Sequence, residues 1–132
     1  MKVVDTYVIA YLHIQGDYTS NARNLLKEDP DWHAPLLWRS EFRNVLSVYI
    51  KTGHLSFADS LRLIEEAEHL MRGKEYHINS PQILSLAADS ECSAYDCEFI
   101  ALANELNERL VTTDQKILRQ FPDLTISLKD NY

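Results

Sequence analysis

Short runs of apolar residues alternate along this chain with longer segments whose apolar positions recur every three or four residues. The short runs are typical of buried strands, and the longer segments are typical of amphipathic helices. Strands that alternate with helices predict a parallel sheet covered on both faces. The pattern predicts strands at Lys2–Val4, His33–Leu37, Lys74–Ile78, Arg109–Thr113 and Leu124–Leu128, and helices at Thr19–Lys27, Trp38–Thr52, Ser56–Met71, Ser80–Ser90 and Ala94–Asn107, with a short helix that ends at Phe121.

Several helix ends carry recognisable signals. Thr19 or Ser20 is expected to cap helix Thr19–Lys27, and Ser56 is expected to cap helix Ser56–Met71. Hydroxyl side chains favour this position because they satisfy free backbone N–H groups. Gly53 and Gly73 lie where two long helices are expected to stop. These signals separate the helical segments clearly along the chain.

Two aspartates lie directly at the ends of predicted strands. Asp5 follows "KVV", and Asp114 follows "LVTT". In parallel sheets, ligands bind in the crevice outside the carboxyl ends of the strands. The two aspartates are therefore the first sign of a site at that edge.

Two further acids interrupt apolar helix faces. Glu41 falls in the apolar stripe of helix Trp38–Thr52, and Asp96 falls in that of helix Ala94–Asn107. Helix N-termini favour negative charge by about 0.3–1 kcal/mol, so helix caps and structural ion pairs are one interpretation of these acids. Buried like charges are costly unless cations offset them, and oxygen ligands are those that Mg²⁺ or Mn²⁺ select. A metal site is the other interpretation, and the spacing leaves both open.

Composition limits the function classes further. A chain of 132 residues with 45% hydrophobic residues is expected to form one compact domain. The net charge is −7, and residues 53–132 carry 14 acids against seven Lys and Arg, which argues against binding duplexes through a basic face. A nucleic-acid substrate would need something to offset this charge, and a divalent metal is the natural candidate. Cys92 and Cys97 do not form a zinc motif. No apolar run is long enough to span a bilayer and no signal sequence is visible, so a cytoplasmic protein is expected.

Four segments resemble the motifs of one family. The segments "VVDTYVIAYL", "RSEFRNVL", "SAYDCEFIALANEL" and "LVTTDQKIL" are similar, in order and interval, to the four motifs of PIN-domain proteins. The total length matches the small prokaryotic members, which are the toxins of VapBC-type toxin–antitoxin pairs. The resemblance implies a PIN-like domain over residues 1–132, with a three-layer α/β/α sandwich around a central parallel sheet.

The resemblance also implies an activity. Members of this kind are endoribonucleases that use Mg²⁺ or Mn²⁺ to hydrolyse RNA phosphodiester bonds, and water attack leaves 5′-phosphate and 3′-hydroxyl ends. Partners implied by the resemblance are the RNA substrate, a small antitoxin protein and a second copy of the chain in a homodimer. Matching motif by motif, the catalytic and metal-binding acids are Asp5, Glu41, Asp96 and Asp114, and the supporting residues are Thr6, Asn44 and Thr112.

The chain also departs from the family pattern. Many members have Asn two residues after the first acid, where this chain has Tyr7, so one supporting polar contact is in question. No strand combines aromatic with basic residues as RNA-binding platforms do. Phosphate contacts would have to come from scattered cations, which are Arg39, Arg43, Lys51 and Lys116.

Other functions are weighed by the same residues. Tyr7 stands where haloacid-dehalogenase-type phosphatases need a second Asp, and "KEYHINSP" lacks the phosphoacceptor Asp of a response-regulator receiver. A DNA-directed PIN-like nuclease is a closer alternative, although the chain looks too short for a helical arch. A catalytically silent PIN-fold interaction module is the alternative from another class. Helices Trp38–Thr52 and Ser56–Met71 carry large side chains expected to lie mostly in the core or else to form a dimer or antitoxin groove, namely Trp38, Phe42, Tyr49, Phe57 and Leu61.

Overall fold

A five-stranded, fully parallel sheet lies at the centre of the computed structural model, which describes all of residues 1–132. Its strands are β1 (Lys2–Val4), β2 (Trp32–Pro35), β3 (Glu75–Tyr76), β4 (Leu110–Thr112) and β5 (Thr125–Ser127). Their order across the sheet is β3-β2-β1-β4-β5. The order changes direction at β1, so a topological switch point lies where β1 and β4 end side by side.

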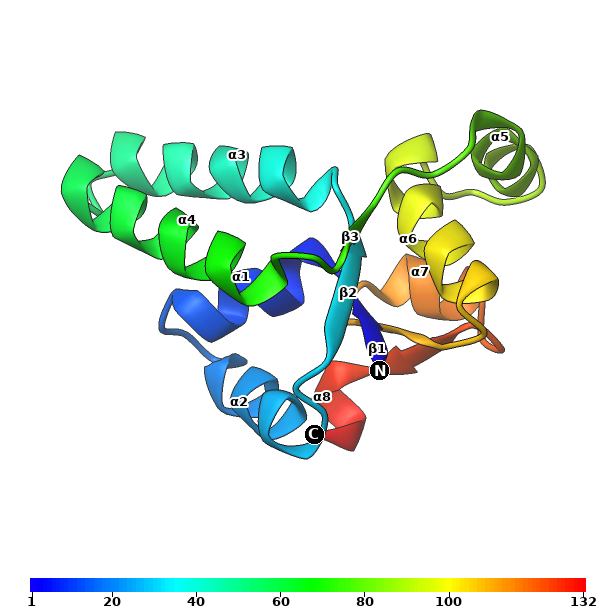
Figure 1. Cartoon of the computed structure of the whole chain (residues 1–132), viewed down its shortest axis with the longest axis horizontal. Coiled ribbons are helices and arrows are strands. Elements are labelled where there is room, and N and C mark those ends of the chain that lie inside the picture. The colour runs from blue at the N-terminus through cyan, green and yellow to red at the C-terminus, as the bar shows by residue number, and fades with distance from the viewer.

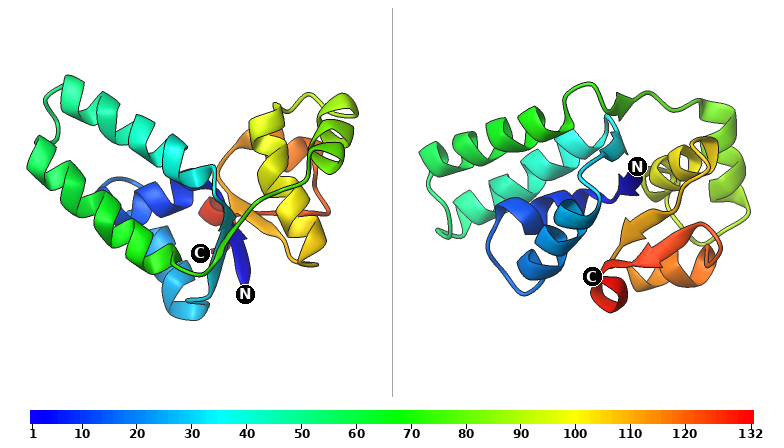
Figure 2. Two further views of the ribbon diagram at one scale, coloured as in Figure 1. Left: turned by 45° about the horizontal axis from the view of Figure 1, so that its top comes forward. Right: turned by 60° about the horizontal axis from the view of Figure 1, so that its bottom comes forward.

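Helices cover the sheet on both sides. Figure 1 shows α1 to α4 on one side and α5 to α7 on the other, and Figure 2 shows α3 and α4 extending together away from the sheet. This arrangement confirms the predicted three-layer α/β/α sandwich. The helices are α1 (Thr6–His13), α2 (Thr19–Glu28), α3 (Trp38–Lys51), α4 (Phe57–Met71), α5 (Ser80–Ala88), α6 (Ala94–Glu105), α7 (Gln115–Gln120) and α8 (Leu128–Asn131).

The core lies on the two faces of the central strands. Val3 and Val4 of β1 and Val111 of β4 are fully buried, as expected of parallel strands covered on both faces. Ile9 of α1 and Ile100 of α6 are fully buried in the same cluster. Because β1 and β4 are held on both faces, their carboxyl ends are fixed in place.

Two local expectations were wrong. Neither Thr19 nor Ser20 caps α2, because Tyr18 occupies the N-cap position without a side-chain bond. The Thr19 hydroxyl instead accepts a hydrogen bond from the Gly16 N–H at 2.9 Å and donates to the Tyr11 carbonyl at 2.7 Å. Helix α8 was not expected from the sequence. Strand β1 has the predicted bounds, and the other four strands are shorter than the apolar pattern suggested. The predicted cap at Ser56 is confirmed.

Candidate active site

The four acids that the sequence singled out all lie at the starts of helices. Asp5 is the N-cap of α1, and Asp114 is the N-cap of α7. Glu41 lies in the first turn of α3, and Asp96 lies in the first turn of α6. Helices α1, α3 and α7 begin directly after β1, β2 and β4, so their first turns lie at the carboxyl edge of the sheet (Figure 1).

Asp5 is held at both carboxylate oxygens. Its Oδ1 accepts a hydrogen bond from the Tyr7 N–H at 3.1 Å, which caps α1, and its Oδ2 accepts one from the Thr112 hydroxyl at 2.6 Å. Burial raises the pKa of Asp5, and the nearby negative charges of Asp114 and Asp96 raise it further. Burial and the neighbouring acids therefore disfavour the ionised form of Asp5 in the folded protein.

Glu41 reaches the same region from α3. The Thr6 hydroxyl donates a 2.7 Å hydrogen bond to Oε1 of Glu41, and this joins the residue after Asp5 to the acid of α3. Burial raises the pKa of Glu41, although the Thr6 bond lowers it, and the charges of Asp5 and Asp96 raise it again. The Thr6 hydrogen bond therefore ties the acid of α3 to the start of α1, next to Asp5.

Asp114 and Thr112 form a turn after β4. The Asp114 N–H donates to Oγ1 of Thr112 at 3.0 Å, and Oδ1 of Asp114 accepts from the Ile117 N–H at 3.0 Å. Thr112 therefore contacts the first and the fourth acid at once, because its hydroxyl also donates to Asp5. It is a fully buried polar residue, and these two contacts satisfy it.

Asp96 lies in the other helical layer, in the first turn of α6. Ser93 caps α6 by accepting a hydrogen bond from the Asp96 N–H at 3.1 Å, so the Asp96 carboxylate is not needed as the cap. The Glu41 carboxylate caps no helix either. The carboxylates of Asp5 and Asp114 therefore cap their helices, whereas those of Glu41 and Asp96 make no cap hydrogen bond and gain only the preference of a first helical turn for negative charge.

The chemistry of this donor set suits a hard divalent cation. None of the four carboxylates forms an ion pair with a Lys, Arg or His side chain. Carboxylate oxygens are the ligands that Mg²⁺ and Mn²⁺ prefer. As the side chains stand, no group of three or more His, Cys, Asp or Glu residues is placed to hold a metal ion. The donor types therefore fit such an ion, while the ligand set remains a prediction.

A cavity of about 490 Å³ opens beside Glu41. Asn44, one turn along α3 from Glu41, is exposed and lines it, as does Thr6. Tyr95, which the sequence did not single out, lines the same cavity from α6. The other lining residues are Tyr7, Leu37, Ser40 and Val45.

The cations expected to contact phosphate lie in different settings. Arg39 is bound to Glu75 by two hydrogen bonds of 2.6 and 2.7 Å, so its guanidinium already has a carboxylate partner, and we do not retain it as a phosphate contact. Arg43 lines a small cavity between α3 and α4, away from the acids. Lys51 and Lys116 are exposed. Lys116 lies two residues after Asp114. Its charge lowers the pKa of the Cys92 thiol, whereas the charge of Asp96 raises it.

The large side chains of α3 and α4 divide between core and surface. Trp38 and Phe42 are fully buried, in agreement with the core interpretation. Phe57 and Leu61 are exposed and line the same small cavity as Arg43. Tyr49 is also exposed.

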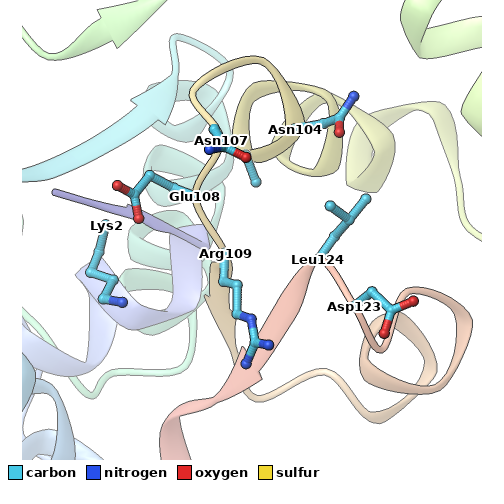
Figure 3. A pocket seen from close by; sticks show the side chains of 8 residues that line it. Lys2, Asn104, Asn107, Glu108, Arg109, Asp123 and Leu124 are labelled. Carbon is cyan, nitrogen blue, oxygen red and sulfur yellow. The ribbon is translucent and has the colours of Figure 1, made fainter.

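A second polar cavity lies away from the acids. Its volume is about 360 Å³, and Figure 3 shows Lys2, Arg109, Glu108 and Asp123 among the side chains around it. These residues lie where β1 and β4 begin, at the edge of the sheet opposite Asp5 and Asp114. Acids and bases are mixed there, so this cavity does not share the charge pattern of the candidate site.

Proteins with a parallel sheet between two layers of helices bind ligands at the carboxyl edge of the sheet, near its switch point. This chain has that fold and carries carboxylates at that edge, so it belongs to this class of α/β proteins. Within that class, the chain belongs to the PIN domain family, whose model matches residues 2–123. It is 24% identical over 125 residues to Ribonuclease VapC3 of Pyrobaculum aerophilum, across 92% of this chain and 95% of that protein. These matches confirm the resemblance to VapC-type PIN-domain proteins.

The fold is also similar to a solved structure. The crystal structure of PAE2754 from Pyrobaculum aerophilum superposes with a TM-score of 0.77 at 18% identity, and the match covers 97% of this chain and 90% of that one. This confirms the fold. None of the helices has both the length and the apolar content that crossing a membrane requires.

Proposed function

We propose that this protein is a Mg²⁺- or Mn²⁺-dependent endoribonuclease and the toxin of a toxin–antitoxin pair. Membership of the PIN domain family, and similarity to a ribonuclease over nearly the whole of both chains, support a nuclease. The observation that carries the proposal is that hydrogen bonds of Thr6 and Thr112 link the Asp5, Glu41 and Asp114 region at the carboxyl edge of the sheet, where no Lys, Arg or His side chain pairs with these acids.

In this proposal the protein's own side chains fix the acids in position. Thr112 and the Tyr7 N–H hold the Asp5 carboxylate from two directions, which leaves little rotational freedom. Thr6 holds Oε1 of Glu41, so Oε2 is the oxygen that can orient a water molecule and accept its proton. A carboxylate with a raised pKa is a better proton acceptor near neutral pH, and Glu41 is shifted in that direction.

Asp5, Asp96 and Asp114 would hold the divalent metal, and Glu41 would either be a fourth ligand or position the attacking water. When bound, such an ion supplies a water of lowered pKa and stabilises the charge that develops on the phosphate. Water attack would leave 5′-phosphate and 3′-hydroxyl ends, which can be identified by end-labelling. Asn44 is proposed to contact the RNA, because it lines the neighbouring cavity together with Glu41.

The test is cleavage of a mixed cellular RNA pool by the purified protein, with Mg²⁺ or Mn²⁺ and with EDTA. We expect cutting that requires the metal and that falls at least about 100-fold in Asp5→Asn and in Asp96→Asn, because changing even the outer partners of metal ligands typically costs about 10- to 100-fold. Glu105→Gln is the matched control, because Glu105 is an exposed acid on the same helix as Asp96. It should cut like the wild type.

Other outcomes would contradict the proposed mechanism or support one of the alternative functions. Cutting that persists in EDTA would contradict the metal-dependent mechanism. Equal cutting of single-stranded DNA of the same sequence would support the DNA-directed alternative. No cutting, together with no heat of Mg²⁺ or Mn²⁺ binding by calorimetry, would support the silent interaction module.

The partners belong to the same proposal. Similarity to a VapC-type protein supports a small antitoxin that restrains the activity. Formation of a homodimer stays a prediction from the family resemblance. Sedimentation of the purified chain measures its oligomeric state directly.

A further inference from the structure

A row of tyrosines leads away from the acids. Tyr7, two residues after Asp5, is 53% exposed, and Tyr95, the residue before Asp96, is 64% exposed. Both line the 490 Å³ cavity that also contains the Glu41 side chain. Large aromatic side chains that are exposed at such a place are available to bind a flat ligand.

Tyr7 also lines a second cavity, of about 290 Å³. Tyr11, Tyr18 and Tyr49 contribute to its walls, and Val45 lines both cavities along with Tyr7. The Tyr7 and Tyr11 ring centroids are 6.2 Å apart, and those of Tyr11 and Tyr18 are 5.0 Å apart. We name this surface, made of Tyr7, Tyr11, Tyr18, Tyr49 and Tyr95, the tyrosine track.

The tyrosine track begins at the acids themselves. The peptide N–H of Tyr7 donates to Asp5, so the Tyr7 ring belongs to a residue that contacts the first acid. The Tyr11 hydroxyl lies 3.2 Å from Oγ1 of Thr113, the residue before Asp114. These contacts place Tyr7 and Tyr11 beside residues that carry or adjoin the first and fourth acids, where the nucleotides next to a bound phosphate would lie.

The charge of the tyrosine track favours contact with bases rather than with phosphates. No Lys or Arg lines either cavity, and the only charged residues there are Glu41 in one and Asp17 in the other. Electrostatic attraction to a phosphate backbone requires cations, and it is weak on such a surface. Stacking of a base on an aromatic ring needs no charge, since every base has a flat face that can pack on the ring.

We propose that Tyr7 and Tyr95 stack on unpaired bases of single-stranded RNA that flank the phosphate to be cut. This inference rests on the proposed ribonuclease function and deepens it by naming two residues of this chain that bind the substrate. Bases within a duplex are stacked on one another, so their faces cannot bind these rings. The two tyrosines thus determine specificity for single strands.

The test uses the RNA found to be cut, shortened to a single-stranded oligonucleotide with 2-aminopurine beside the cleaved phosphate. Stacking on tyrosine quenches this fluorescent base, and stopped-flow mixing with Mg²⁺ records the quenching before cleavage. We expect Tyr7→Ala and Tyr95→Ala to raise KM about tenfold and to reduce the quenching, with a smaller effect on kcat. Tyr7→Phe keeps a ring and should retain both properties.

Controls separate stacking from folding. Phe57→Ala removes an aromatic side chain that is 67% exposed on α4, and it should leave KM and quenching unchanged. The melting temperatures of the Tyr7 and Tyr95 variants should match the wild type because both side chains are exposed. A duplex of the same sequence should be cut at least about tenfold more slowly.

Failure of this inference and failure of the proposed function give different results. A wild type that cuts RNA while Tyr7→Ala and Tyr95→Ala keep their KM and their quenching overturns base stacking alone. Equal cutting of the duplex and the single strand overturns it as well. A wild type that cuts no RNA overturns both proposals.

Discussion

Glu75 is the acid with the most complete set of partners in the protein. Arg39 donates to it from Nε at 2.6 Å and from Nη2 at 2.7 Å, and Trp38 donates from Nε1 at 2.8 Å. The Arg39 hydrogen bonds hold the pKa of Glu75 below its ordinary value of 4.5, and the Trp38 bond acts in the same direction. Because β3 is an edge strand, these bonds attach it to the start of α3.

This pair gives a prediction for the pH dependence of stability. A lowered pKa in the folded state means that Glu75 stabilises the fold fully above about pH 4.5, and that this contribution is lost as the pH falls through the lower, folded value. Glu75→Gln should therefore reduce the free energy of unfolding at pH 7 by about 1–3 kcal/mol, as expected for lost hydrogen bonds to a charged group. Urea unfolding at pH 7, 5, 4 and 3 should find the difference shrinking in the acid range.

Glu66→Gln is the control for that series. Glu66 meets Arg62 on the exposed side of α4, where an ion pair contributes little. Glu66→Gln should therefore change the free energy of unfolding little at every pH. A Glu75→Gln difference that stayed constant down to pH 3 would contradict the prediction.

Single residues differ in how far the sequence could reveal their surroundings. The four acids were visible because a carboxylate after an apolar strand or inside an apolar helix stripe departs from the pattern around it. Arg39 was predicted to contact phosphate. Its pairing with Glu75 was not visible, because Glu75 lies 36 residues away and no local pattern joins the two. Tyr95 was missed for a similar reason, because only the packing of α6 places it in the cavity with Glu41.

At the scale of helices, two serine caps provide a matched pair. Ser93 caps α6 by accepting from the Asp96 N–H at 3.1 Å, and Ser56 caps α4 by accepting from the Asp59 N–H at 3.0 Å. Either change to Ala should reduce the free energy of unfolding by about 1 kcal/mol. Only Ser93→Ala should also lower RNA cleavage, because it loosens the turn that carries Asp96. Thermal unfolding and initial cleavage rates at saturating metal measure the two effects separately.

Ser93→Asp sharpens this comparison. Aspartate caps helices as well as serine does, so it should restore the lost stability. It should not restore cleavage fully, since it adds another negative charge beside Asp96. If Ser56→Ala impaired cleavage as much as Ser93→Ala, general loss of stability would account for both, and a positional role for the α6 cap would be excluded.

Elements could be predicted better in their existence than in their ends. Helices α3, α4 and α6 were clear because each carries several turns of one apolar period. Strands of two to four residues are too short to show where pairing stops, so His33–Leu37 was expected where the strand runs from Trp32 to Pro35. The cap of α2 was misjudged because the Thr19 hydroxyl contacts Tyr11, eight residues earlier, instead of its own helix.

For the molecule as a whole, alternation of strands and helices was enough to predict the parallel sandwich. The sequence could also place Asp5 and Asp114 at one edge, since parallel strands end on the same side. It could not show that β1 and β4 are neighbours, and this pairing is what brings Thr112 to Asp5 across 107 positions of sequence. The candidate site therefore depends on the topology as much as on its residues.

Gathering acids at one edge has a cost for the stability of the whole fold. Burial, and then the charges of Asp5 and Asp96, disfavour the ionised form of Glu41 in the folded state. Glu41→Gln removes that charge and keeps an oxygen that can accept the Thr6 hydrogen bond. In EDTA at pH 7, this variant should therefore be more stable than the wild type, by about 0.5–2 kcal/mol, as is common when a functional site gives up a strained charge.

Glu105→Gln, an exposed change of equal charge, should have little effect on urea unfolding. Addition of Mg²⁺ should stabilise the wild type more than Glu41→Gln and so narrow the gap. If Glu41→Gln were less stable than the wild type in EDTA, the acids would be stabilising one another through the fold, and repulsion at this edge would not be the reason that the site attracts a cation.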